Sequence, residues 1–79
     1  MDAIDLRDFI VGLLIISDGG PAERWRPVVG DVEVIGIGRH TNWRVRPQGS
    51  ADELFSVHVA VQLARENVPF VDVPSKASA

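Results

Sequence analysis

The sequence predicts an α+β domain in which a three-stranded antiparallel meander carries two helices packed on one face, in the order α-β-β-β-α. Helix capping and stop signals lie near both ends of the chain, and the stretch between them alternates apolar and polar residues around two turn signals. A chain of 79 residues has room for one hydrophobic core. We therefore expect a single domain over residues 1–74, followed by a frayed tail over residues 75–79.

The first helix is expected at residues 3–17. Asp2 is a good helix-capping residue, and the sequence Asp-Gly-Gly-Pro at residues 18–21 is typical of a helix end. Residues 9–16 are apolar on every side, however, and several of them are β-branched. A strand over residues 9–17 is therefore the alternative interpretation.

Two hairpin turns are expected in the middle of the chain. Glycine and aspartate at residues 30–31 separate two β-branched runs, which is typical of a two-residue type II′ turn. Residues 38–41 predict a second loop, whose register places Trp43 opposite Gly36. The two registers agree on one inward face of the meander, which would carry Trp25, Pro27, Val29, Val32, Val34, Gly36, Trp43 and Val45.

A second helix is expected after residue 50. Ser50 followed by Glu53 is a capping box, and the helix should run to about residue 66. Residues 68–73 could add a short C-terminal strand. One stripe at helical spacing would pack on the sheet, and it contains Leu54, Val57, Ala60, Val61 and Ala64.

Composition excludes several classes of function. The chain has no cysteine, which excludes disulfides and thiol chemistry, and only two histidines, so we expect no metal site and no cofactor. Asp2, Asp5 and Asp8 are interpreted as acids that favour a helix start rather than as a cation site. The longest apolar run is too short to span a membrane, and a cytoplasmic location is expected by default.

No catalytic motif is present, and we expect a protein that is not an enzyme. His40, in a predicted loop, is the only plausible acid–base group, and His58 falls on a polar helix face. The glycines at residues 36 and 38 are interpreted as hairpin residues, because no helix is expected after them to hold a phosphate.

The leading functional prediction is a protein-interaction module that is homodimeric or bound to another protein. One small sheet face cannot cover the apolar side chains that both helices carry, and a large exposed apolar patch usually marks an association site. The residues expected at this protein interface are Val11, Ile15, Phe55 and Val59.

An arginine-bearing sheet face is the basis of the alternative function, weak binding of nucleic acid or another anion. The expected registers place Arg24, Arg26, Arg44 and Arg46 together on the outer face, and the arginine fork suits phosphate. Glu33 falls within this patch, where a cross-strand ion pair with Arg46 would make the face ordinary solvated surface.

Overall fold

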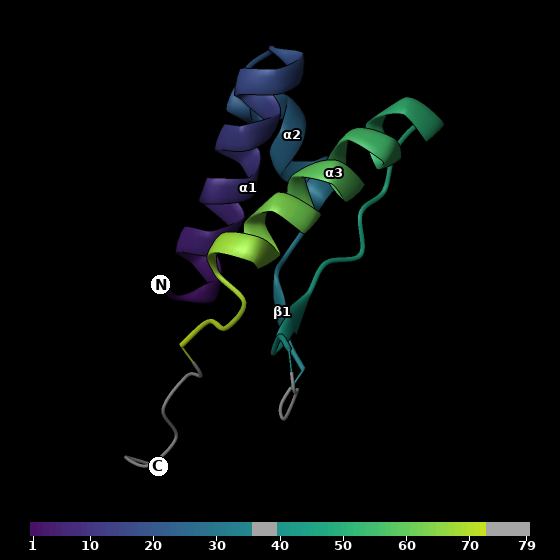
Figure 1. The fold of residues 1–79 in the computed structure, drawn as a ribbon. Coiled ribbons are helices and arrows are strands. Elements are labelled where there is room, and N and C mark those ends of the chain that lie inside the picture. Colours follow the sequence, from purple (N-terminus) through teal and green to yellow (C-terminus); the bar gives the residue numbers. More distant parts are fainter. Residues whose placement is uncertain (36–39, 73–79) are drawn as a thin grey trace.

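The computed structural model describes residues 1–35 and 40–72. Within these residues it contains three helices and one two-stranded antiparallel sheet, so the predicted three-stranded meander with two helices is wrong (Figure 1). The mixture of helices with a small sheet remains. The elements are α1 (Ala3–Asp18), α2 (Ala22–Val29), β1 (Glu33–Val34), β2 (Trp43–Arg44) and α3 (Ala51–Asn67).

Helix α1 forms almost where the capping signals placed it. The Asp2 carboxylate accepts a hydrogen bond from the backbone N–H of Asp5 at 2.8 Å. At the other end Gly19 takes a φ of 80° and donates its N–H to the carbonyl of Ile15 at 2.9 Å. The predicted helix is confirmed, and the alternative strand over residues 9–17 is wrong.

Helix α2 replaces what was expected to be the first strand of the meander. The helix begins after Pro21 and ends at Val29. The next residue, Gly30, has a φ of 71° and donates its N–H to the carbonyl of Arg26 at 2.9 Å. The glycine and aspartate at residues 30–31 therefore end a helix and do not form a hairpin turn. The predicted hairpin between residues 29 and 32 is wrong.

The physical reason is that two residues four apart share a face in both a strand and a helix. Trp25 and Val29 are such a pair, so their spacing cannot separate the two structures. Val28 and Pro27 do separate them: in α2, Val28 joins the buried face and Pro27 is exposed. In the helix, Val28 therefore takes the buried position that the strand would have given to Pro27.

The two short strands pair with a different register from the expected one. Val34 lies opposite Trp43 and Glu33 opposite Arg44, whereas Trp43 was expected opposite Gly36. The shift is two residues, because the loop that joins the strands is longer than four residues. A shift of two preserves the faces, so Val34 and Trp43 still share one face. Gly36 itself lies outside the described residues.

Helix α3 starts with the predicted capping box. The Ser50 backbone N–H donates to Glu53 Oε1 at 2.9 Å, and the Glu53 N–H donates to Ser50 Oγ at 3.2 Å. The helix then runs to Asn67, one residue beyond the expected end.

The segment after α3 is not the short strand that was expected. Residues 68–72 have no strand assignment, and residue 73 and the predicted tail lie outside the described part of the chain. A buried asparagine holds the segment instead: Asn42 donates to the carbonyl of Val71 at 3.0 Å and accepts from its N–H at 2.8 Å.

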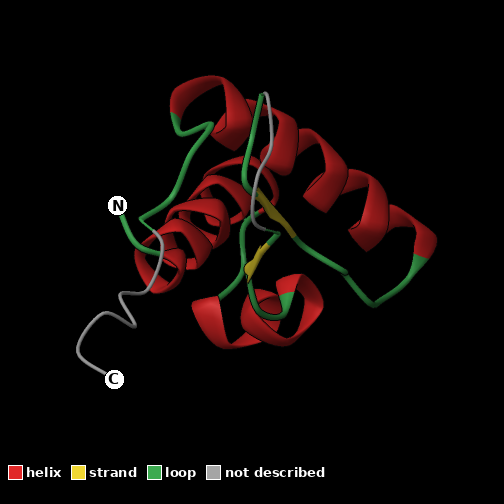
Figure 2. Ribbon diagram, turned by 90° about the horizontal axis from the view of Figure 1, so that it is seen from below, coloured by secondary structure: helices red, strands yellow, loops and turns green. Residues whose placement is uncertain are grey.

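The three helices and the strand β2 close around one core. Helix α1 packs against both α2 and α3, and the two short strands lie beside the helices (Figure 2). Both tryptophans are buried, as the sequence indicated, but Trp25 comes from a helix. Their ring N–H groups donate to the carbonyls of Gly19 and Val68, each at 2.8 Å. The core contains Leu6, Ile10, Val11, Leu14, Trp25, Val28, Val29, Trp43, Val57, Ala60, Val61, Ala64 and Val71.

Candidate functional site

An apolar groove runs between α1 and α3 on the outside of the molecule. Its hollow has a volume of about 290 Å³, at the lower end of what small-molecule pockets offer. That size suits the entry of a few side chains. The lining residues are Leu13, Ile16, Ser17, Asp18, Phe55, Ser56, Val59, Ala60 and Leu63.

The α3 wall of the groove is built by helical spacing. Phe55, Val59 and Leu63 follow one another at intervals of four residues and therefore lie along one side of the helix. They are 69%, 41% and 45% exposed. On the α1 wall, Ile16 is 85% exposed. Four large apolar side chains from two neighbouring helices thus remain in contact with water.

Small side chains form the floor and one end of the groove. Ala60 is buried between the helices, and the Ser56 hydroxyl donates to Asp18 at the end of α1. Ser17 donates to the other oxygen of the same carboxylate at 2.9 Å. The hydrogen bonds from Ser56 and Ser17 lower the pKa of Asp18 below its usual range, with a smaller contribution from Arg24. Asp18 is therefore held as a carboxylate where α1 and α3 meet.

The predicted interface residues fall in two different places. Phe55 and Val59 line the groove, as an interface would require. Val11 is 3% exposed and belongs to the core, and Ile15 packs partly buried against that core. In this structure α1 turns Val11 into the core and Ile15 toward it, so neither of these two residues lines the groove.

Two of the residues that complete the groove were not predicted from the sequence. Ile16 and Leu63 were not selected, although Leu63 continues the spacing of Phe55 and Val59 by one further turn. The signal that could have found Leu63 was this second apolar stripe on α3. Ile16 had no comparable signal, because the apolar run of α1 extends all round the helix.

The four arginines do not share one sheet face. Arg24 and Arg26 lie on α2, whereas Arg44 and Arg46 lie on and after β2. Arg24 stacks over the Trp25 ring, 4.5 Å from its centroid, and its Nε lies 3.8 Å from the Glu53 carboxylate on α3.

Arg44 and Arg46 share a single carboxylate. Their Nε atoms lie 3.1 and 3.0 Å from the same oxygen of Glu33. The predicted ion pair between Glu33 and Arg46 is confirmed, and Arg44 joins it. This shared carboxylate offsets part of the positive charge that an anion would need there.

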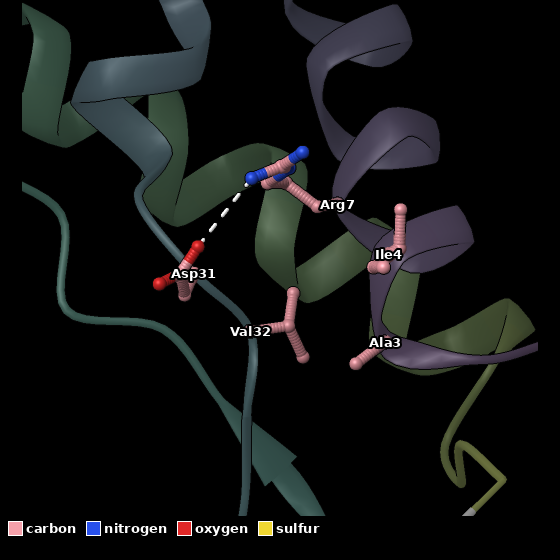
Figure 3. A pocket seen from close by; sticks show the side chains of 5 residues that line it. All are labelled: Ala3, Ile4, Arg7, Asp31 and Val32. Atoms are coloured by element: carbon pink, nitrogen blue, oxygen red, sulfur yellow. Dashed lines mark hydrogen bonds and ion pairs between the residues drawn. The ribbon is translucent and has the colours of Figure 1, made fainter.

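A second hollow lies beside the start of α1. Figure 3 shows the Arg7 side chain pointing from α1 toward Asp31, the residue that follows Gly30. Their closest atoms are 3.4 Å apart, and the Asp31 side chain is 91% exposed. Ile4 and Val32 line the same hollow. The Asp31 carboxylate offsets part of the positive charge that an acidic ligand would need in this hollow.

The histidines stand apart from each other. His40 is exposed in the loop before β2, and His58 is exposed on α3, where it borders a third hollow with Val45, Leu54 and Arg65. Residues 1–35 and 40–72 hold no cluster of three or more histidine, aspartate or glutamate side chains that could bind a metal ion.

Comparisons with models of protein families, with curated proteins and with solved structures gave no match. None of the helices in the described ranges is both long enough and apolar enough to cross a membrane. The surface of this chain is therefore the basis on which a function can be assigned.

Proposed function

We propose that this protein is a small non-catalytic protein-interaction module, and that the groove between α1 and α3 receives a helix of its partner. The observation that carries the proposal is the gathering of four exposed apolar side chains around one hollow: Ile16, Phe55, Val59 and Leu63. An amphipathic helix can insert its apolar side chains into such a hollow between two adjacent helices.

The energetics favour a partner over open solvent. Complete burial of one such side chain contributes about 1.5–3 kcal/mol relative to exposure. The fold does not need these four residues, because the buried core is closed without them. They are therefore available to stabilise a complex. Association entropy opposes the gain, so we expect moderate, roughly micromolar, affinity.

Selection of helical peptides of about 16 residues on the full chain tests this proposal. We expect selected peptides to bind the wild-type chain and to lose binding to Phe55→Asp and Val59→Asp, because a carboxylate in the groove would have to be desolvated. Ile4→Asp is the matched control: Ile4 is also an exposed apolar residue of a helix, at 65%, but lines the other hollow.

Two results would contradict the groove proposal. The first is a selection that enriches no peptide on the wild-type chain. The second is a set of peptides that bind Phe55→Asp and Ile4→Asp equally well. Sedimentation of the chain alone tests self-association, the other form of interaction expected from the sequence. If the groove joins two copies, the dimer should dissociate in Phe55→Asp. The cytoplasmic location expected from the sequence stays a prediction.

A further inference from the structure

Acidic side chains stand at both ends of the exposed stripe on α3. Asp52 lies three residues before Phe55, and Glu66 lies three residues after Leu63, so both continue the same side of the helix. Both are exposed, and neither forms an ion pair with another residue in the described part of the chain. The groove therefore has an uncompensated negative charge at each end.

The helices that form the groove are also negative as a whole. Each of α1 and α3 contains three acidic residues and one arginine, which gives each a formal charge of −2. The whole chain carries −3, so the remainder is slightly positive. Among the residues that line the groove, Asp18 is the only charged one. The apolar stripe is thus bordered by acids and not by bases.

A second copy of the chain is a poor occupant for such a groove. Antiparallel packing of two α3 stripes about Val59 would set Asp52 against Glu66 of the second copy, and like charges in contact disfavour the pair. The basic helix of the chain, α2, cannot serve either, because its apolar residues Trp25, Val28 and Val29 are already buried. An anionic membrane surface would be repelled in the same way.

We infer that the occupant is an amphipathic helix of another protein whose apolar stripe enters the groove and whose flanks carry lysine or arginine. This inference rests on the proposed function and names the chemistry of the partner. The stripe from Phe55 to Leu63 spans about 12 Å at the rise of an α-helix, which matches two to three turns of the occupant. Basic residues one turn beyond each end of its apolar stripe would then meet Asp52 and Glu66.

Three synthetic helical peptides of 16 residues test the inference against the full chain. They share leucines at positions i, i+4 and i+7 and differ only in the four flanking residues, which are lysine, glutamine or glutamate. We expect the lysine peptide to bind about tenfold more tightly than the glutamate peptide at 50 mM salt, since each new surface ion pair contributes modestly. The difference should shrink at 500 mM salt, where surface charges are screened.

Variants of the protein separate a local charge effect from a general one. Asp52→Asn combined with Glu66→Gln should remove most of the preference for lysine. The matched control combines Glu23→Gln with Asp8→Asn, which removes the same formal charge. Glu23 is an exposed acid in the first turn of α2, as Asp52 is in the first turn of α3, and Asp8 is an exposed acid of α1 outside the groove lining. This control should keep the preference.

The outcomes distinguish the two proposals. If all three peptides bind equally and Phe55→Asp abolishes binding, the groove is a docking site and the inference about basic partners is overturned. If none of the peptides binds, both proposals fail. If the chain sediments as a dimer that Phe55→Asp dissociates, the occupant is a second copy, and a basic partner helix is excluded as the primary occupant.

Discussion

Helix α3 has two apolar faces, of which one is buried in the core and the other is exposed to solvent. Val57, Ala60 and Val61 face the core and are at most 6% exposed. Phe55 and Leu63 belong to the same helix and are 69% and 45% exposed. Both faces carry apolar side chains, so hydrophobicity does not distinguish the buried face from the exposed one.

Side-chain size explains which face became the core. Ala60 and Ala64 lie on the core face, where small side chains let neighbouring elements approach closely, and larger residues such as Leu14 belong to the same core. The outer face instead carries a phenylalanine and a leucine, which would hold a close neighbour away. Hydrophobicity alone therefore does not identify the core face of a helix, because close packing also needs small residues at the contact.

The largest expected difference between the two faces comes from one pair of substitutions on α3. Val57→Asp would bury an unpaired carboxylate, which should lower the free energy of unfolding by at least about 3 kcal/mol and could prevent folding. Phe55→Asp, two residues away, should change it by no more than about 0.5 kcal/mol. Urea unfolding followed by circular dichroism measures both. Equal destabilisation would show that the outer face is part of the core.

A smaller effect on stability is expected at Asn42, which holds the segment after α3 in place. Asn42→Ala removes both hydrogen bonds to Val71 and leaves these buried backbone groups without partners, so the free energy of unfolding should fall by about 2 kcal/mol. Asn67→Ala, which removes an exposed bond to Leu63, is the control and should be nearly neutral. Hydrogen exchange at the Val71 amide should accelerate in the first variant alone.

Helix α1 should tolerate a residue with a higher helix propensity at Gly12. A Cβ added at Gly12 meets no atom within 4 Å, so Gly12→Ala should raise the free energy of unfolding by about 0.5–1 kcal/mol through the better helix propensity of alanine. Gly19→Ala should instead lower it, because Gly19 has a φ of 80°. If Gly12→Ala were destabilising, α1 would pack more closely at this point than the structure shows.

The smallest effect is expected in the dependence of stability on pH. Backbone hydrogen bonding at Ser50 lowers the pKa of Glu53, as the serine hydrogen bonds lower that of Asp18. A lowered pKa in the folded state stabilises the fold above the unfolded-state pKa, and this contribution is lost as the pH falls below about 4 and through the folded-state pKa. Carboxyl titration by NMR should show the Asp18 pKa rising in Ser56→Ala, with that of Glu53 unchanged.

Local signals accounted for the two long helices. Asp2 and Ser50 cap backbone N–H groups within three residues of themselves, and Gly19 ends α1 through its own backbone conformation. Such contacts involve only neighbours in the chain, so the amino-acid types at these positions are sufficient to predict them. The confirmed ion pair between Glu33 and Arg46 joins residues that are further apart in the chain. It could be predicted because the expected strand pairing placed both side chains on the correct face of the sheet, although its register was shifted by two residues.

The ends of α1 and α3, the burial of both tryptophans and the surplus of apolar side chains on α3 could be predicted from the amino-acid types alone. The helix over residues 22–29 could not, because a strand and a helix both place Trp25 and Val29 on the same side. The burial of Val28 against the other helices then favours the helix. The packing of the helices also determines which apolar side chains of α1 stay exposed: Val11 turns inward and Ile16 outward. A helix that is apolar all round has no preferred face until its neighbours are in place.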